Sequence, residues 1–388
     1  MVKISLLASD FSKNGITRVL FLGKMLRKRY RVEVVGPASD GSIWGPLASE
    51  KDLECTILPV KGHFRSSTHM RELAGMIDGD VVYPVKPLSS SFGVGLFRKL
   101  AARNPLILDI DDWDRGLYLE DLKAKSRSAL MMSLAHSTLH PFDPCSFWGT
   151  LFFERLIPYT DEITVSSHFL QNRFGGTIVW HARSAEMFDP GVYDRSLLRG
   201  KYAIDDGKRV VMFMGTPRPH KGLEDLIEAV RLNGSDDIIC MVVGMDDSEY
   251  CRDLVACGKK HLGSCFQSYG LQPFSNVPEF LALSDLVVIP QRRGPATVGQ
   301  VPAKLFDAMA MARPIIATDV SDLSRILDGC GWIVEPDAPD QIAEKIASIL
   351  HHPEEAEAIG RHARQRFLSS YSEGAVEKTL FKVFRQFE

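Results

Sequence analysis

The chain has 388 residues, which suits two domains of ordinary size better than one. Hydrophobic residues make up 45% of it and charged residues 24%, proportions that are typical of a globular protein and exclude a wholly disordered or fibrous chain. The 46 basic and 49 acidic residues give a formal net charge of −3, so no broad basic surface for nucleic acid is expected.

The cysteines and the apolar runs indicate the cellular compartment of the protein. No pair of the seven cysteines has the C-x-x-C spacing of a zinc or redox site, which indicates reduced thiols. The short apolar run at residues 2–8 predicts a first strand rather than a signal peptide, and no apolar run is long enough to span a membrane. We expect a cytoplasmic protein and leave open a peripheral contact with the inner face of the membrane.

In the first half, short β-branched runs alternate with amphipathic stretches, which predicts α/β units with parallel strands. The helix expected at residues 16–29 places Val19, Leu20, Leu22 and Leu26 on one stripe. The expected strands are residues 2–7, 32–35, 55–58, 81–85, 106–110, 163–165 and 178–180.

One apolar and aromatic region, residues 128–157, breaks this rhythm. Pro141 and Pro144 stand in its middle, which predicts two helices split by a proline turn. We favour burial of its apolar side chains within the first domain. The alternative is a surface for an apolar acceptor or a membrane.

The second half repeats the pattern after an irregular hinge at residues 182–206. The expected strands are residues 210–214, 238–243, 265–269, 286–289, 315–318 and 332–334. The expected helices are residues 223–232, 278–283, 301–311 and 341–350, with two more over 354–387.

This alternation predicts an α/β fold of two Rossmann-like, doubly wound parallel-sheet domains that face a cleft. The first domain is expected at residues 1–185 and the second at 186–369. A terminal helix at about residues 370–388 is expected to pack back onto the first domain.

Ligands of such sheets bind at the carboxyl ends of the strands, and four segments follow strand ends. In the first, Asn14 and Gly15 precede a helix, where backbone N–H groups can face an anion. An ordinary loop is the alternative. In the second, residues 214–222, glycines flank Arg218, His220 and Lys221, a combination that suits a diphosphate.

The third segment, residues 294–310, begins with small residues that allow a ligand to approach the backbone, and Pro302 lies near the first turn of the following helix. Asp307, further along that helix, could accept both hydroxyl groups of a ribose. The alternative is a surface ion pair between Lys304 and Asp307.

The fourth segment places four acids at a strand end, with Asp109 and Asp111 on the same face of the strand. Crowded carboxylates need cations or hydroxyl donors, so an acceptor or catalytic site is expected here. Helix capping by Asp112 or Asp114 is the rival interpretation, and a metal site is a third.

Residues 213–229 resemble the phosphate turn and following helix of retaining GT-B glycosyltransferases, the group 1 or family 4-like enzymes. Residues 302–319 are similar to a second motif of that family, and shorter echoes at 269–270, 284–290 and 331–334 fall in the family's order. Together these motifs are specific, although none is so alone. The resemblance is looser in the first half.

The resemblance implies a nucleotide-diphosphate-sugar donor held by the second domain and an acceptor on the first. The acceptor would be a saccharide, a lipid-linked compound or a small molecule, and the sugar would keep its anomeric configuration. Lys221 would hold the diphosphate, Asp307 the ribose, and Gly15 would approach the phosphate. The implied catalytic residues are Lys221, Arg218 and Asp111. The implied donor-binding residues are Gly15, Gly215, Thr216, Arg218, Lys221, Gly299, Val301, Lys304 and Asp307. No metal or other cofactor is expected.

Three positions depart from the family's pattern. Thr216 stands where an arginine often follows the glycine, Gly299 where the first of two paired acids stands, and Asp111 where a histidine is common. Two alternatives therefore stay open: a nucleotide-sugar epimerase, and a noncatalytic nucleotide-sugar-binding or scaffold protein.

Overall fold

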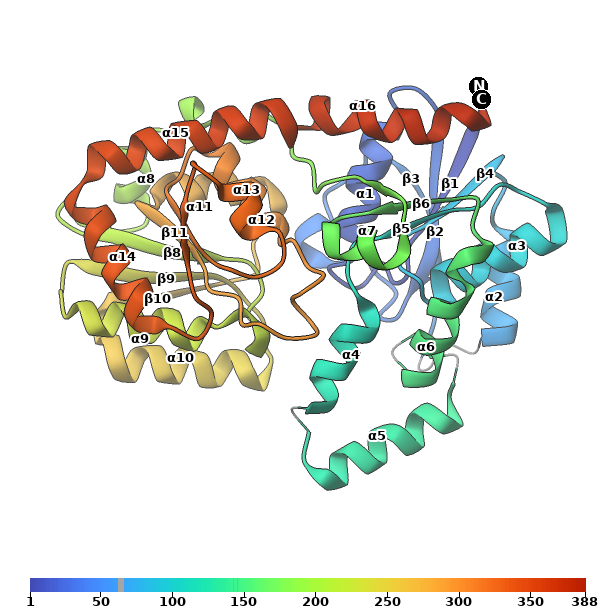
Figure 1. The fold of residues 1–388 in the computed structure, drawn as a ribbon, viewed down its shortest axis with the longest axis horizontal. Helices are drawn as coiled ribbons and strands as arrows, with labels where there is room; N and C mark the ends of the chain where they lie inside the picture. The colour runs from blue at the N-terminus through green and yellow to red at the C-terminus, as the bar shows by residue number, and fades with distance from the viewer. Residues whose placement is uncertain (62–65, 124, 142, 145) are drawn as a thin grey trace. The chain divides into compact units, whose positions relative to one another are not determined.

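The computed structural model describes residues 1–61, 66–123, 125–141, 143–144 and 146–388. The chain forms two compact units (Figure 1). Unit 1 consists of Met1–His181, Gly294–Gln300 and Val376–Glu388, and unit 2 of Ala182–Arg293 and Val301–Ala375. The segment Gly294–Gln300, which the sequence led us to expect in the second domain, is therefore part of the first unit.

Unit 1 is built on parallel strands in the order β3-β2-β1-β4, followed by β5-β6-β7. Parallel bridges from Val82 to Leu106 and from Val85 to Asp109 link β4 to β5, so the strands form one continuous row. The strands are β1 (Lys3–Leu7), β2 (Arg31–Ala38), β3 (Glu54–Pro59), β4 (Val81–Pro84), β5 (Ile107–Ile110), β6 (Glu162–Val165) and β7 (Thr177–Ile178).

Helices cover this sheet because their apolar residues meet those of the strands. One core cluster joins Leu7, Val82 and Leu108 of the strands to Phe153 and Leu170 of the helices. The helices of unit 1 are α1 (Ile16–Leu26), α2 (Ser66–Gly75), α3 (Val94–Ala102), α4 (Asp114–Lys123), α5 (Arg127–Leu139), α6 (Phe147–Leu156) and α7 (His168–Phe174).

Unit 2 has a six-stranded parallel sheet in the order β10-β9-β8-β11-β12-β13. This is the strand order of a Rossmann fold, with the reversal between β8 and β11. The strands are β8 (Arg209–Met214), β9 (Ile238–Met245), β10 (Phe266–Gly270), β11 (Leu286–Ile289), β12 (Ile315–Thr318) and β13 (Trp332–Val334).

The helices of unit 2 pack a second core cluster against this sheet, which includes Phe213, Leu226 and Ile346. They are α8 (Arg195–Lys201), α9 (Leu223–Asn233), α10 (Glu249–Leu262), α11 (Val277–Leu283), α12 (Ala303–Ala310), α13 (Leu323–Leu327), α14 (Pro339–His351) and α15 (Pro353–Ser370).

The hinge expected to be irregular contains helix α8. Asp194 caps it, since the Asp194 carboxylate accepts hydrogen bonds from the amides of Ser196 and Leu197 at 2.9 and 3.1 Å. A capping aspartate of this kind compensates for the amides that a short helix leaves unpaired.

The last helix, α16 (Glu373–Phe384), begins in unit 2 and its residues from Val376 onward belong to unit 1. There the Phe381 ring lies 6.2 Å from Tyr30 and the Phe384 ring 5.1 Å from Tyr83, both in edge-on contacts. Aromatic pairs of this geometry stabilise packing beyond the area that they bury.

The region at residues 128–157 forms two helices, α5 and α6, on either side of the prolines. The expectation that its apolar side chains are buried was wrong for most of them. Met131, Met132, Leu139, Trp148 and Phe152 are exposed, and Phe153 alone of the region's large aromatic residues in the described chain is buried. Within the described residues, no helix is long and apolar enough to cross a membrane.

Candidate functional site

Two clusters of charged side chains lie at strand ends, one in each unit. The cluster of unit 2 follows β8, where Gly215 has a φ of 117° and Gly222 a φ of 65°. A Cβ at Gly222 would collide with the carbonyl oxygen of Pro290, so both backbone angle and space require glycine there. The turn at residues 216–221 therefore lies between β8 and α9.

Lys221 and Arg218 are held in place differently. The Lys221 Nζ donates to the backbone carbonyl of Thr216 at 2.7 Å. The Arg218 guanidinium lies 2.8 Å from a carboxylate oxygen of Asp246. Burial favours the neutral acid, but hydrogen bonds from Ser248, Cys251 and Arg218 outweigh it and lower the pKa of Asp246.

Lys304, on α12, lies against the same turn. Its Nζ is 3.5 Å from the centroid of the Phe213 ring, and a Cβ built on Gly215 would lie 3.0 Å from it. This Nζ is buried and has no hydrogen-bond partner among the described residues. Burial, with repulsion from Lys221, holds the pKa of Lys304 well below its ordinary range, although Asp307 opposes the shift.

Asp307 is also buried, with 6% of its surface exposed, and its carboxylate pairs with the guanidinium of Arg183. Burial raises the pKa of Asp307, and the charge of Arg183 opposes that rise. The alternative of a surface ion pair between Lys304 and Asp307 was therefore wrong, because both groups are buried and the carboxylate pairs with Arg183 instead.

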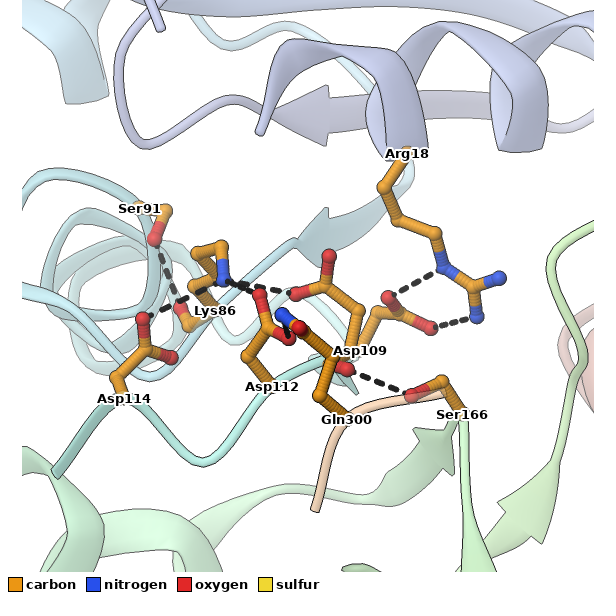
Figure 2. A network of polar contacts seen from close by, with 9 residues as sticks. Arg18, Lys86, Ser91, Asp109, Asp112, Asp114, Ser166 and Gln300 are labelled. Atoms are coloured by element: carbon orange, nitrogen blue, oxygen red, sulfur yellow. Dashed lines mark hydrogen bonds and ion pairs between the residues drawn. The ribbon is translucent and has the colours of Figure 1, made fainter. Parts of the chain in front are cut away.

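The cluster of unit 1 surrounds Lys86, which follows β4 (Figure 2). Its Nζ lies 3.1 Å from Asp111, 2.8 Å from Asp112 and 3.4 Å from Asp114. Lys86 has a φ of 73°, and its carbonyl accepts a hydrogen bond from the Ser91 hydroxyl at 2.8 Å. A lysine rarely adopts this backbone angle, so the surrounding structure must hold it.

Burial and charge set the pKa values of this cluster. Burial would lower the pKa of Lys86, but the three carboxylates raise it well above its ordinary range. Burial raises the pKa of Asp111 to about 7 and that of Asp114 to about 6. For Asp112, hydrogen bonds from Lys86 and Gln300 and the charge of Lys86 outweigh burial and lower the pKa to about 2.

Asp109 does not share this cluster, although it lies on the same strand end. Its carboxylate accepts two hydrogen bonds from Arg18, at 2.9 and 3.0 Å, and one from Thr164 at 2.6 Å. Arg18 also donates to the carbonyl of Val179 at 2.7 Å. This bidentate pair is fully buried, and Arg18 also donates to a backbone carbonyl. Asp109 therefore has a structural role, in which it connects β5 to Thr164 of β6 and to Arg18 of α1, and it does not bind a ligand.

Gly15 lies beside the Lys86 cluster, since a Cβ built on it would be 3.5 Å from the Lys86 Cε. The amides of Ile16, Thr17 and Arg18 donate to carbonyls three residues earlier. Those three N–H groups are therefore already paired and do not face an anion.

Gly299 and Gln300 belong to the same unit as the acids. The Gln300 amide donates to Asp112 at 2.8 Å, and the Gly299 carbonyl accepts from the Ser167 hydroxyl at 2.9 Å. A Cβ on Gly299 would lie 3.1 Å from Phe169 and 3.2 Å from Trp113, closer than side chains usually approach. The position of the family's first acid thus has little room for a side chain, while the neighbouring Val301 is buried in unit 2.

The structure assembles Gly215, Thr216, Lys221, Lys304 and Asp307 around one strand end of unit 2. It assembles Gly15, Asp111 and Gly299 with the cluster of unit 1. Sequence reasoning missed Lys86, Arg183 and Gln300. Lys86 could have been predicted from the sequence, because it follows the buried strand β4, and β4 lies next to β5, the strand after which the acids come. No group of three side chains that could hold a metal ion occurs among residues that the structure describes.

Comparison with solved structures defines the class of fold. HepE of Anabaena, in complex with UDP-glucose, has a TM-score of 0.77 at 15% identity, and the match covers 100% of both chains. Sucrose-phosphate synthase from Thermosynechococcus elongatus has a TM-score of 0.75 at 15% identity, over 100% of this chain and 99% of the other. The chain therefore has the GT-B fold of two Rossmann-like units.

Comparison of the sequence adds a family. Residues 194–366 match the family described as glycosyl transferases group 1. An alpha-D-kanosaminyltransferase of Streptomyces kanamyceticus is 27% identical over 198 residues, which are 50% of this chain and 49% of the relative. The chain spans about half the length of the first curated relatives that it matches.

Proposed function

We propose that this chain transfers a sugar from a nucleotide-diphosphate-sugar donor to an acceptor hydroxyl with retention of configuration. The observation that carries the proposal is the buried Nζ of Lys304 against Gly215, which has no hydrogen-bond partner among the described residues. The names of an alpha-D-kanosaminyltransferase and of a solved structure in complex with UDP-glucose support the same reaction class.

A buried amine without an acceptor is unfavourable unless a ligand supplies one. Lys221 lies near enough to Lys304 to lower its pKa, so two amines converge on the glycine turn. A diphosphate would offer oxygens to both and would favour protonation of Lys304. In the proposal, Arg218 adds a third cation and Asp307 contacts the ribose, a role in which its carboxylate is already oriented by Arg183.

The chemical step breaks the bond between the sugar's anomeric carbon and the diphosphate oxygen. The acceptor oxygen forms the new bond on the same face, and its proton passes to the departing phosphate. Negative charge grows on the leaving diphosphate, and Lys221 and Lys304 would stabilise that charge. Asp111 would accept a hydrogen bond from the acceptor hydroxyl and orient it.

The test is isothermal titration of the full chain with UDP and other nucleoside diphosphates in buffers of different ionisation enthalpy. Because burial holds the pKa of Lys304 below its ordinary range without ligand and a nearby phosphate should raise it, binding should take up protons at pH values between those two pKa values. Lys304→Met should keep the fold and lose that uptake. Binding with identical proton uptake in both proteins would contradict the assignment.

A measurement of turnover distinguishes the proposed enzyme from a noncatalytic binder. The noncatalytic binder is the alternative that the glycine at position 299 favours. A donor that binds should be hydrolysed or transferred by the wild-type chain, and the anomeric configuration of the product can be read by NMR. We also propose that no metal is required, since lysines supply the positive charge. Loss of all activity in excess chelator would refute that part.

A further inference from the structure

Helices α5 and α6 carry a set of exposed apolar side chains, which we call the α5–α6 surface. On α5, Met131, Met132 and Leu139 are 68%, 67% and 77% exposed. On α6, Trp148 and Phe152 are 45% and 47% exposed. Large apolar side chains gathered on neighbouring helices commonly mark a surface that binds a partner or a membrane.

Hydrogen bonds join the two helices into one surface. The Trp148 amide donates to the Ser137 hydroxyl at 3.3 Å, and the Trp148 indole donates to Thr138 at 3.2 Å. Phe152 and Arg155 follow Trp148 at helical spacing and therefore extend along the same side of α6. In Figure 1, α5 lies farther from the strands of unit 1 than α6 does, at the outer end of that unit.

The charges of this region favour an anionic partner. Helix α5 contains no aspartate or glutamate, and Arg127 begins it. On α6 the exposed charge is that of Arg155, because Glu154 accepts hydrogen bonds from Trp113 and Arg173. Arginines beside exposed methionine, leucine and tryptophan side chains are the combination found where helices lie in a membrane interface.

We propose that the α5–α6 surface docks this chain on a lipid bilayer with anionic headgroups. The apolar side chains enter the boundary between headgroups and acyl chains, and the tryptophan ring takes the position that indoles favour there. Arg127 and Arg155 contact lipid phosphates. The inference goes beyond the proposed function and stands on different residues, so either can fail without the other.

The test is flotation of the 388-residue chain with vesicles of phosphatidylcholine, alone or mixed with phosphatidylglycerol. We expect binding to the mixed vesicles, weaker binding to phosphatidylcholine and a decline with added salt. The variant M131S/M132S/L139S should bind at least about tenfold more weakly, because burial of even one such side chain contributes a factor of that size. Arg127→Gln should weaken binding about fivefold.

A matched control is Leu197→Ser, which removes an equally exposed leucine, 73% exposed, from α8 of unit 2. It should bind vesicles like the wild-type chain. All variants should keep the wild-type circular dichroism spectrum and the calorimetric response to UDP. The proposal is overturned if the wild-type chain does not bind the mixed vesicles, if the triple variant binds them equally well, or if the surface instead mediates self-association in size-exclusion chromatography.

Discussion

Each unit holds a buried lysine near the end of a strand, and the two lysines differ in what surrounds them. Lys86 of unit 1 lies within 3.4 Å of three carboxylates, whereas the Nζ of Lys304 in unit 2 has an aromatic ring beneath it and no hydrogen-bond partner among the described residues. Their pKa values move in opposite directions, upward for Lys86 and downward for Lys304.

This difference separates a structural cation from one that is available to a ligand. The charge of Lys86 is already neutralised, so its removal should damage the fold. The charge of Lys304 is opposed by its surroundings, so its removal should harm ligand binding and leave the fold intact.

Lys86→Met should lower the free energy of unfolding by about 3–5 kcal/mol, since it leaves buried carboxylates without their cation. The loss should shrink at acidic pH, where protonated carboxylates no longer need the lysine. Urea unfolding followed by tryptophan fluorescence measures it.

The matched control is Lys99→Met, which removes an ion pair with Asp161 that is partly exposed to solvent. That change should cost less than about 1 kcal/mol. Equal losses in the two variants would show that the Lys86 cluster does not hold unit 1 together.

Lys221→Ala should reduce kcat by about a hundredfold or more, comparable with the loss of one donor from an oxyanion hole. Lys221 is only partly buried and donates to a backbone carbonyl, so the thermal midpoint should change little. Steady-state kinetics with the donor that binds best would measure the effect, and near-normal turnover would contradict a role in leaving-group stabilisation.

Asp111→Asn should reduce kcat about tenfold, the contribution of one hydrogen bond to a charged group. In the wild-type chain, kcat should rise with pH through about 7, since the ionised Asp111 accepts a stronger hydrogen bond from the acceptor hydroxyl than the protonated acid does. Asp114→Asn tests the same assignment in a second way. It removes a charge that raises the pKa of Asp111, so the rise in kcat should move to lower pH. An unchanged profile in both variants would exclude Asp111.

The sequence predicted the strands of both sheets well, because buried parallel strands are short β-branched runs separated by amphipathic helices. It also located the glycine turn at Gly215 and the acidic strand end at Asp111. It did not reveal Lys86 as the partner of Asp111 or Arg183 as the partner of Asp307. The position of Lys86 after a strand next to the acidic one was a usable signal, whereas a single arginine such as Arg183 has no pattern that names its partner.

Two other features could not be predicted because they depend on tertiary packing. Composition alone did not show whether another element covers Met131 and Trp148, and burial was expected where the structure leaves them exposed. Nor did sequence order show that Gly294–Gln300 packs with unit 1, since the residues before and after this segment belong to unit 2. Both errors arose where contacts join residues far apart in the chain.

The smallest expected effect concerns Gly299. Gly299→Ala should change the free energy of unfolding by less than about 1 kcal/mol, because the reduced entropy of the unfolded chain offsets mild crowding. Gly299→Glu, which restores the acid common in the family, should instead cost about 1–3 kcal/mol through overpacking against Trp113 and Phe169. Urea unfolding of both variants distinguishes these effects. If the glutamate variant were as stable as the wild-type chain and more active, the glycine would not be explained by lack of space.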